Sequence, residues 1–170
     1  IRPLERAKSI RAFAQRLREN AKELALIDAA TGGNPWRDLI MDVEIAASQL
    51  DFFAGLVTEM KGHSVPMGPG EFSFSVREPL GIVARIIPFN HPLMFSAGKA
   101  AAPLAAGNSL IIKPPEQAPV SALRLAELSE GLFPAGVFNV IPGGKDVGAE
   151  LASDPRVAAV AVIGSVATGI

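Results

Sequence analysis

From Gly81 onward the chain alternates short apolar runs with helical stretches, and this alternation constrains the fold more than any other feature. The runs lack the polar-apolar alternation of a half-exposed strand, which favours strands that are covered on both faces. The apolar runs lie at residues 82–87, 110–112, 137–141 and 157–163, and the helical stretches between them at 93–106, 120–130 and 147–152. This order predicts an α/β fold with a parallel, doubly wound sheet.

Two helices are expected before the sheet. Apolar residues recur at helical spacing over residues 3–30, with charged residues on the opposite face, and a Thr-Gly-Gly sequence follows. Asn34 is expected to cap a second helix that has Pro35 at its first position and ends near Gly62. We interpret residues 1–62 as a helical hairpin that packs on the sheet.

Residues 63–80 are expected to form a loop followed by a protruding strand. Glycine and proline are frequent between His63 and Gly70, which indicates a loop. A half-buried strand is predicted after it, because polar residues alternate with Phe72, Phe74 and Val76. A strand outside the main domain often pairs with another chain, so its edge is a candidate subunit contact.

The composition excludes several classes of protein. Lys and Arg number 16 against 17 Asp and Glu, which leaves no field to attract nucleic acid or an anionic membrane. Charged residues and prolines interrupt every apolar run before the roughly 18 residues of a membrane span. The chain has no cysteine and two separate histidines, so no metal site is expected. We expect a soluble, cytoplasmic protein.

The two ends of the chain suggest a piece of a longer protein. The chain opens on Ile1 instead of methionine, and it closes at Gly169–Ile170, directly after a glycine turn that is expected to lead into another helix. We therefore interpret residues 81–170 as an incomplete sheet domain.

An unusual turn follows each predicted strand. The carboxyl ends of parallel strands meet at one edge of a doubly wound sheet, and ligands bind there. The turns are Pro88–Pro92, Lys113–Glu116, Pro142–Gly144 and Gly164–Gly169. The sequence therefore predicts a binding site along this edge.

These turns, with other sequence strings, resemble the NAD(P)-dependent aldehyde dehydrogenase superfamily in order and spacing. The strings are Glu78–Gly81, the Pro-Phe-Asn turn, Ala105–Asn108, Lys113–Glu116 and the final Gly-Ser turn. The two leading helices and the strand near Phe74 are also similar to that family. The resemblance implies an amino-terminal fragment that ends before the catalytic Glu and Cys. It also implies a partial Rossmann-like NAD-binding domain over residues 81–170 and an oligomerisation strand within residues 63–80.

The resemblance implies that Asn90 and Lys99 take part in catalysis. The neutral amide of Asn90 would donate a hydrogen bond to the oxyanion that forms on the aldehyde. The alternative is that Asn90 caps the helix that Pro92 begins. Lys99 matches a family lysine thought to assist proton movement near the nucleophile. The wall of the substrate tunnel would include His91, Met94 and Phe95, which suggests a polar or aromatic aldehyde.

The resemblance also assigns the cofactor site. Lys113 and Glu116 would hydrogen-bond the adenosine ribose, and the carboxylate would repel a 2′-phosphate, which favours NAD over NADP. The alternative for these two residues is a solvated charge pair. The usual G-x-G-x-x-G fingerprint is absent. Further cofactor contacts are implied for Ile86, Ile87, Pro88, Phe89, Pro115, Gly144, Gly148, Gly164, Ser165 and Thr168.

The implied activity is oxidation of an aldehyde to a carboxylic acid through a cysteine thiohemiacetal, with hydride transfer to NAD. Because this chain has no cysteine, it is predicted to be inactive alone. The complete protein is expected to be a homodimer or homotetramer. Two alternatives remain: a noncatalytic nucleotide-binding or structural relative, and a CoA-acylating or semialdehyde dehydrogenase.

Overall fold

A parallel four-stranded sheet forms the centre of the fold, as the pattern of apolar runs predicts. The computed structural model describes residues 1–169. In space the strands follow the order β5 (Phe138–Val140), β4 (Ser109–Lys113), β3 (Ile82–Ile86) and β6 (Val157–Val162). Each neighbouring pair in this order is parallel. Parallel strands need crossover connections, and helices supply them here.

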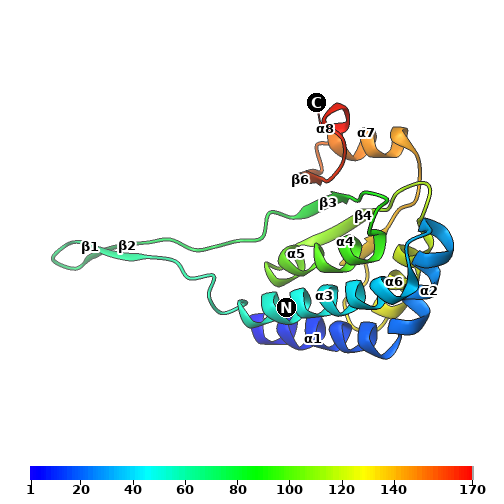
Figure 1. The fold of residues 1–170 in the computed structure, drawn as a ribbon. Helices are drawn as coiled ribbons and strands as arrows, with labels where there is room; N and C mark the ends of the chain where they lie inside the picture. Colours follow the sequence, from blue (N-terminus) through cyan, green and yellow to red (C-terminus); the bar gives the residue numbers. More distant parts are fainter. Residues whose placement is uncertain (170) are drawn as a thin grey trace.

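The sheet is doubly wound, which confirms the predicted fold class. The crossovers on one face are α4 (Pro92–Gly98), α5 (Ala101–Ala105) and α6 (Val120–Ser129). On the other side of the sheet in Figure 1 lie α7 (Lys145–Ser153) and the short α8 (Val166–Gly169). The chain therefore runs from β3 outward through β4 to β5, and then returns to place β6 on the free side of β3.

A layer of three helices covers the face that carries α4 to α6 (Figure 1). These helices are α1 (Pro3–Glu19), α2 (Ala21–Gly32) and α3 (Trp36–Gly55). Their apolar stripes share one continuous core with β3 and β4. Phe13 of α1 illustrates the packing, because its ring lies edge-on to Phe133 at 5.8 Å and to Phe138 at 5.4 Å between centroids.

The predicted single helix over residues 3–30 is wrong, because the chain breaks at Asn20 into α1 and α2. Asn20 leaves the helical region with φ −107° and ψ 15°, and its Nδ2 donates to the carbonyl of Arg16 at 2.8 Å. A short amide side chain that satisfies a terminal carbonyl in this way competes with helix continuation.

The predicted helix over residues 93–106 is also divided, into α4 and α5. Pro103 explains the break. It has no N–H to donate to the carbonyl of Lys99, and its ring would clash with that carbonyl in a continuous helix. Lys99 becomes the carboxyl-terminal cap of α4, and Ala100 is the amino-terminal cap residue of α5.

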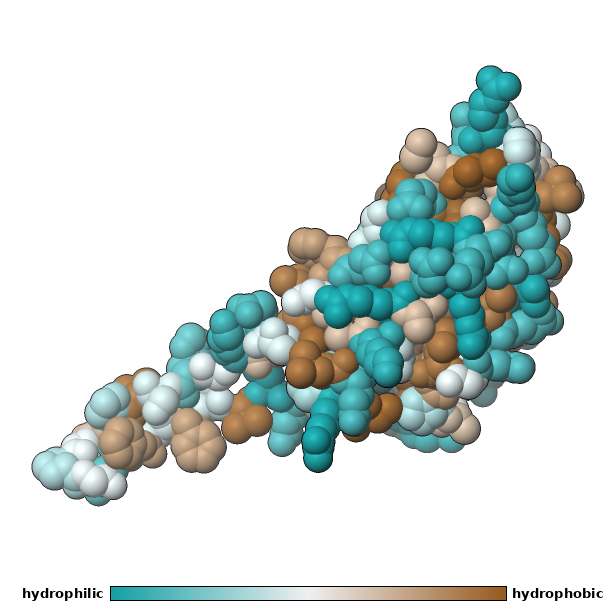
Figure 2. All heavy atoms as spheres, turned by 90° about the horizontal axis from the view of Figure 1, so that it is seen from below, coloured by the Kyte–Doolittle hydropathy of each residue, from teal (hydrophilic) through white to brown (hydrophobic). Residues whose placement is uncertain are grey.

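The loop predicted over residues 63–70 is wrong for most of its length, because Ser64–Gly68 form a strand. The strand β1 (Ser64–Gly68) pairs antiparallel with β2 (Glu71–Phe74) in a hairpin that extends far from the body (Figure 1). Pro66 is tolerated because both strands of a two-stranded ribbon are edges. The predicted half-burial of β2 is wrong too. Every residue of the hairpin is exposed, and apolar side chains line the arm in Figure 2.

Two helix starts differ from the prediction. Asn34 does not cap α3, which starts at Trp36 with Pro35 as its cap residue, and the Asn34 side chain bonds elsewhere. The helix α7 starts at Lys145, two residues before its predicted start, because Gly144 already has extended backbone geometry. Gly148 lies inside α7.

Within residues 1–169, none of the helices combines the length and the apolar character that crossing a lipid bilayer requires.

A buried carboxylate connects the helical layer to α4. Asp28 of α2 is 1% exposed, and its Oδ2 accepts a hydrogen bond of 3.0 Å from the amide of Leu93. Its Oδ1 has no partner within the described part of the chain. Burial raises the pKa of Asp28 above its ordinary value, and the Ser121 hydroxyl and the Leu93 amide partly oppose this increase.

The variant Asp28→Asn keeps an acceptor for Leu93 and removes the buried charge. Because the pKa of Asp28 is raised in the folded state, the charge costs stability above that pKa. We expect Asp28→Asn to unfold in urea at a concentration equal to or above that of the wild type at pH 8. This advantage is expected to shrink as the pH falls below the raised pKa, because the folded wild type then takes up a proton.

The matched control is Asp28→Leu, which also removes the charge but provides no acceptor for the Leu93 amide. It is expected to lose about 1–3 kcal/mol of unfolding free energy at pH 8. Equal destabilisation by the two variants would contradict the role of this hydrogen bond.

Candidate functional site

The carboxyl ends of the four strands lie along one edge of the sheet. Ile86 at the end of β3 pairs with Lys113 of β4 on one side and with Val162 of β6 on the other. Ile112 of β4 pairs with Val140 of β5. The four turns that the sequence singles out therefore leave the sheet side by side, and we call this edge the rim.

The chain reverses its winding direction between β3 and β6. From β3 it continues toward β4, whereas β6 joins the sheet on the opposite side of β3 after the return crossover. In doubly wound sheets the connections diverge at such a switch point and leave a crevice outside the strand ends, where ligands bind. The Asn90 turn and the Gly164–Ser165 turn border this position.

Asn90 lies in the turn between β3 and α4 and is exposed. Its backbone carbonyl accepts a hydrogen bond of 2.6 Å from Nδ2 of Asn34. Its side-chain amide makes no hydrogen bond to any residue that the structure describes. The cap position of α4 belongs to His91, so Asn90 is not the cap of that helix. Its amide is thus available for a ligand.

The three residues predicted for the substrate wall lie on or next to α4. Nδ1 of His91 lies 2.6 Å from Oδ2 of Asp42 on α3, and the His91 ring is edge-on to Phe95 at 6.3 Å between centroids. Met94 and Phe95 are half-buried, and Phe95 also packs against the core. Lys99, the predicted proton-transfer residue, is half-buried at the end of α4.

Sequence reasoning missed Asp42, which is only 7% exposed. It lies one helical turn after Leu39 and directly before Val43, both in the buried stripe of α3. A carboxylate within an apolar stripe was the available signal, because burying it without a partner is costly. Asp28 shows the same pattern four residues after the buried Leu24.

Lys113 is the last residue of β4 and Glu116 lies three residues after it. The two form no ion pair in the described structure, which contradicts the charge-pair alternative. Lys113 is 7% exposed, and its Nζ donates to the carbonyl of Pro114 at 3.2 Å. Glu116 is exposed at the rim, and Pro115 between them is buried. The carboxylate is therefore free to accept hydrogen bonds from a ligand.

Two glycines at the start of α7 and within it, Gly144 and Gly148, lie against this segment. A Cβ atom at Gly144 would lie 3.3 Å from Oε2 of Glu116, so a side chain there would crowd the carboxylate. A Cβ atom at Gly148 would reach 3.8 Å from Cδ1 of Ile86 and 4.0 Å from Cδ of Lys113. The structure thus brings together residues from β3, the β4 turn and α7 that the family resemblance assigns to one site.

The last turn lies at the end of β6. Ser165 Oγ and Thr168 Oγ1 lie 2.9 Å apart, and Gly164, Ser165 and Thr168 are all exposed. Of the remaining rim residues, Ile87 is buried, Pro88 is half-buried and Phe89 is exposed. The amide of Ile163 donates to the carbonyl of Ile86, which holds the β6 turn beside the Asn90 turn.

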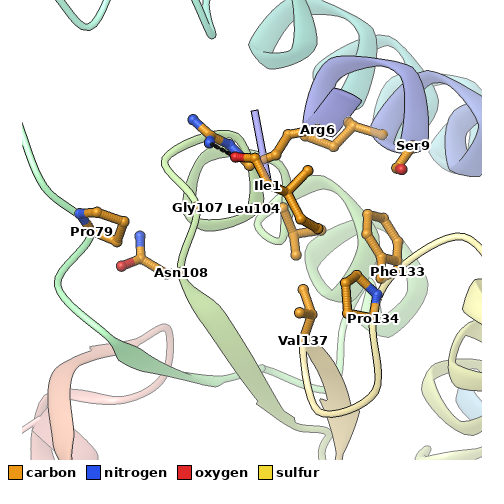
Figure 3. A pocket seen from close by; sticks show the side chains of 11 residues that line it. Ile1, Arg6, Ser9, Pro79, Leu104, Gly107, Asn108, Phe133, Pro134 and Val137 are labelled. Carbon is orange, nitrogen blue, oxygen red and sulfur yellow. Dashed lines mark hydrogen bonds between the residues drawn. The ribbon is translucent and has the colours of Figure 1, made fainter. Parts of the chain in front are cut away.

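Two other features lie outside the rim. A cavity of about 280 Å³ is found where β4 and β5 begin, and Figure 3 shows Asn108, Val137 and Phe133 around it. Arg6 at its edge donates to the carbonyl of Ile1 at 2.9 Å. This cavity lies at the amino ends of the strands, opposite the rim. In the described part of the chain, no group of three or more His, Cys, Asp or Glu residues could hold a metal ion.

The chain is similar to known proteins along its whole length. Aldehyde dehydrogenase tropH of Talaromyces stipitatus is 49% identical over 169 residues, which cover 97% of this chain and 33% of that protein. The crystal structure of PnpE from Pseudomonas sp. WBC-3 matches with a TM-score of 0.94 at 39% identity, covering 98% of this chain and 35% of that one. PnpE has also been solved in complex with nicotinamide adenine dinucleotide.

A second solved structure is the NAD⁺ complex of an aldehyde dehydrogenase from Bacillus cereus. It matches with a TM-score of 0.95 at 34% identity and covers 99% of this chain and 35% of that one. The chain therefore spans about a third of the length of the relatives that it matches. All 170 residues match the sequence profile of the aldehyde dehydrogenase family, to which this chain belongs.

Proposed function

We propose that this chain is the amino-terminal part of an NAD-dependent aldehyde dehydrogenase that oxidises an aldehyde to a carboxylic acid. The observation that carries the proposal is the free side-chain amide of Asn90 at the switch point of the sheet. The NAD complexes of two structural relatives support the choice of cofactor.

In this proposal Asn90 is the oxyanion donor. A neutral amide can stabilise the negative charge that develops on the aldehyde oxygen without competing for a proton. The nucleophile would be a cysteine thiolate, and residues 1–170 contain no cysteine, so the chain alone is inactive. Bound NAD would supply the hydride acceptor. Lys99 would assist proton movement near the nucleophile.

The residues at the end of β4 would hold the adenosine ribose. The exposed carboxylate of Glu116 can accept hydrogen bonds from both ribose hydroxyls, and the Lys113 ammonium lies on the same segment. Gly144 fits this role, because any side chain there would meet the Glu116 carboxylate. The exposed Ser165 turn would donate to the pyrophosphate. Further contacts would come from Ile86, Ile87, Pro88, Phe89, Pro115, Gly148, Gly164 and Thr168.

His91, Met94 and Phe95 would line the aldehyde site and select a polar or aromatic substrate. A noncatalytic nucleotide-binding relative would bind NAD without turnover. A CoA-acylating or semialdehyde dehydrogenase would differ in its acyl acceptor or substrate. Assays of the complete protein with a panel of aldehydes, with and without coenzyme A, separate these functions.

The central test is Asn90→Ala in the complete protein. Removal of an oxyanion donor is expected to lower kcat by about 10²–10³-fold. Stability is expected to remain unchanged, because the Asn90 side chain is exposed and makes no described hydrogen bond. Gln117→Ala, which removes another exposed amide near the rim, serves as the control and should retain wild-type kcat. A wild-type kcat for Asn90→Ala would disprove the role.

Glu116→Gln tests the choice of cofactor. The substitution keeps the size of the side chain and removes the charge that would repel a 2′-phosphate. Calorimetric titration of the complete protein is expected to show the NAD-to-NADP affinity ratio falling about tenfold, which corresponds to ~1.4 kcal/mol. Glu130→Gln at the end of α6 provides the charge-matched control. If the wild type binds NADP as tightly as NAD, the discrimination by Glu116 does not exist.

The β1–β2 hairpin is the proposed subunit contact of a homodimer or homotetramer. Its exposed apolar side chains include Phe72 and Phe74. In the complete protein, Phe74→Asp is expected to yield monomers in sedimentation analysis while the fold of each subunit is retained, because Phe74 is exposed and lies outside the core cluster. Ser73→Asp places the same charge on the opposite face of the strand and should preserve the oligomer. An intact oligomer with Asp at position 74 would refute the assignment.

A further inference from the structure

Three hydrogen bonds connect the helical layer to the start of α4. Nδ2 of Asn34 donates to the Asn90 carbonyl at 2.6 Å, and Oδ2 of Asp42 lies 2.6 Å from Nδ1 of His91. Oδ2 of Asp28 accepts from the Leu93 amide at 3.0 Å. The partners are 56, 49 and 65 residues apart in the sequence, so tertiary contacts and not local ones hold this segment.

The turn between β3 and α4 has few local hydrogen bonds that could hold it in place. Pro88 and Pro92 have no N–H to donate, and they restrict the backbone without fixing where the turn lies on the protein. The cap position of α4 provides no side-chain hydrogen bond. The position of Asn90 therefore depends on the bonds that arrive from the helical layer.

Within residues 1–169, neither the Asn34 nor the Asp42 side chain makes a further hydrogen bond. Asn34 does not cap α3, and the hydrogen bond of its side chain in the described structure is the one to Asn90. Asp42 lies in an apolar stripe, where a carboxylate is costly unless it is paired. Its partner is His91. Because a carboxylate can only accept, the bond places a hydrogen on Nδ1 and fixes the orientation of the ring.

We propose that Asn34 and Asp42 are positioning residues that hold the Asn90 turn, so that the Asn90 amide stays aimed at the rim. The proposal rests on the proposed function, in which that amide donates to the oxyanion. A donor of this kind must be held within about 0.5 Å of its productive position. Asn34 fixes the backbone at Asn90. Asp42 fixes the next residue, His91, by its hydrogen bond to the His91 imidazole.

The test compares Asn34→Ala with Asn20→Ala in the complete protein. Both variants remove an amide that donates to a backbone carbonyl. Asn20, however, lies at the other end of α2 from Asn34, and it bonds to the carbonyl of Arg16 in α1. Asn34→Ala is expected to lower kcat about tenfold with unchanged KM for NAD, whereas Asn20→Ala retains wild-type kcat. If Asn34→Ala lowers the unfolding midpoint more than the control, Asn34→Asp replaces it, because it keeps the shape and lacks the donor.

A double variant separates positioning from a structural effect. If Asn34 acts through Asn90, the pair Asn34→Ala and Asn90→Ala is expected to be no slower than Asn90→Ala alone. Rescue provides a second criterion. Asp42→Asn retains an acceptor for His91 and should keep most of the activity, whereas Asp42→Ala should lose about tenfold in kcat.

Independent, multiplicative losses in the double variant, or equal kcat for Asn34→Ala and Asn20→Ala, would overturn the positioning role. If Asn90→Ala itself keeps wild-type kcat, the proposed function is wrong, and the positioning role that depends on it is wrong too. If Asn90→Ala is slow but Asn34→Ala is fully active, the positioning role is overturned and the proposed function is not.

Discussion

The parallel pairing of β3 with β4 on one side and β6 on the other is the constraint on which the remaining structure depends. This register sets Ile86 opposite both Lys113 and Val162, so the turns that follow these strands must leave at the same edge. The helices of the crossovers then occupy opposite faces (Figure 1). The switch point lies between β6 and β3, the strand that the Asn90 turn follows. The position of the candidate site is thus a consequence of strand order, and its proposed chemistry comes from the turn residues.

Hydrophobic periodicity was sufficient to predict the sheet, because strands covered on both faces need continuous apolar runs and parallel strands need helical crossovers. The periodicity could not locate the helix breaks. At Asn20 a side chain competes with the backbone for a carbonyl, and at Pro103 a single missing donor divides an apolar helix. The hairpin was missed because Pro66 and the nearby glycines are typical of loops, and because a strand that pairs only with its neighbour needs no buried face.

The residues on the rim could be predicted because each follows a recognisable apolar run. The residues that support them could not. Asn34, Asp42 and Asp28 reach the start of α4 across 49 to 65 residues of sequence, and no local pattern encodes such contacts. Asp28 and Asp42 could have been noticed in the sequence, because each is a carboxylate within an apolar helix stripe. Asn34 could not, since an asparagine before a proline is typical of a helix start.

Hydrogen–deuterium exchange of the complete protein with and without NAD tests the central claim, that the dinucleotide binds along the rim. The account predicts slower exchange on NAD binding at the backbone amides of residues 86–91 other than Pro88, of Lys113 and Glu116, and of residues 164–168, because the bound ligand would cover them. The β1–β2 hairpin and the cavity near Asn108 are predicted to be unaffected. Protection at that cavity, or unchanged exchange along the rim with NAD bound, would contradict the account.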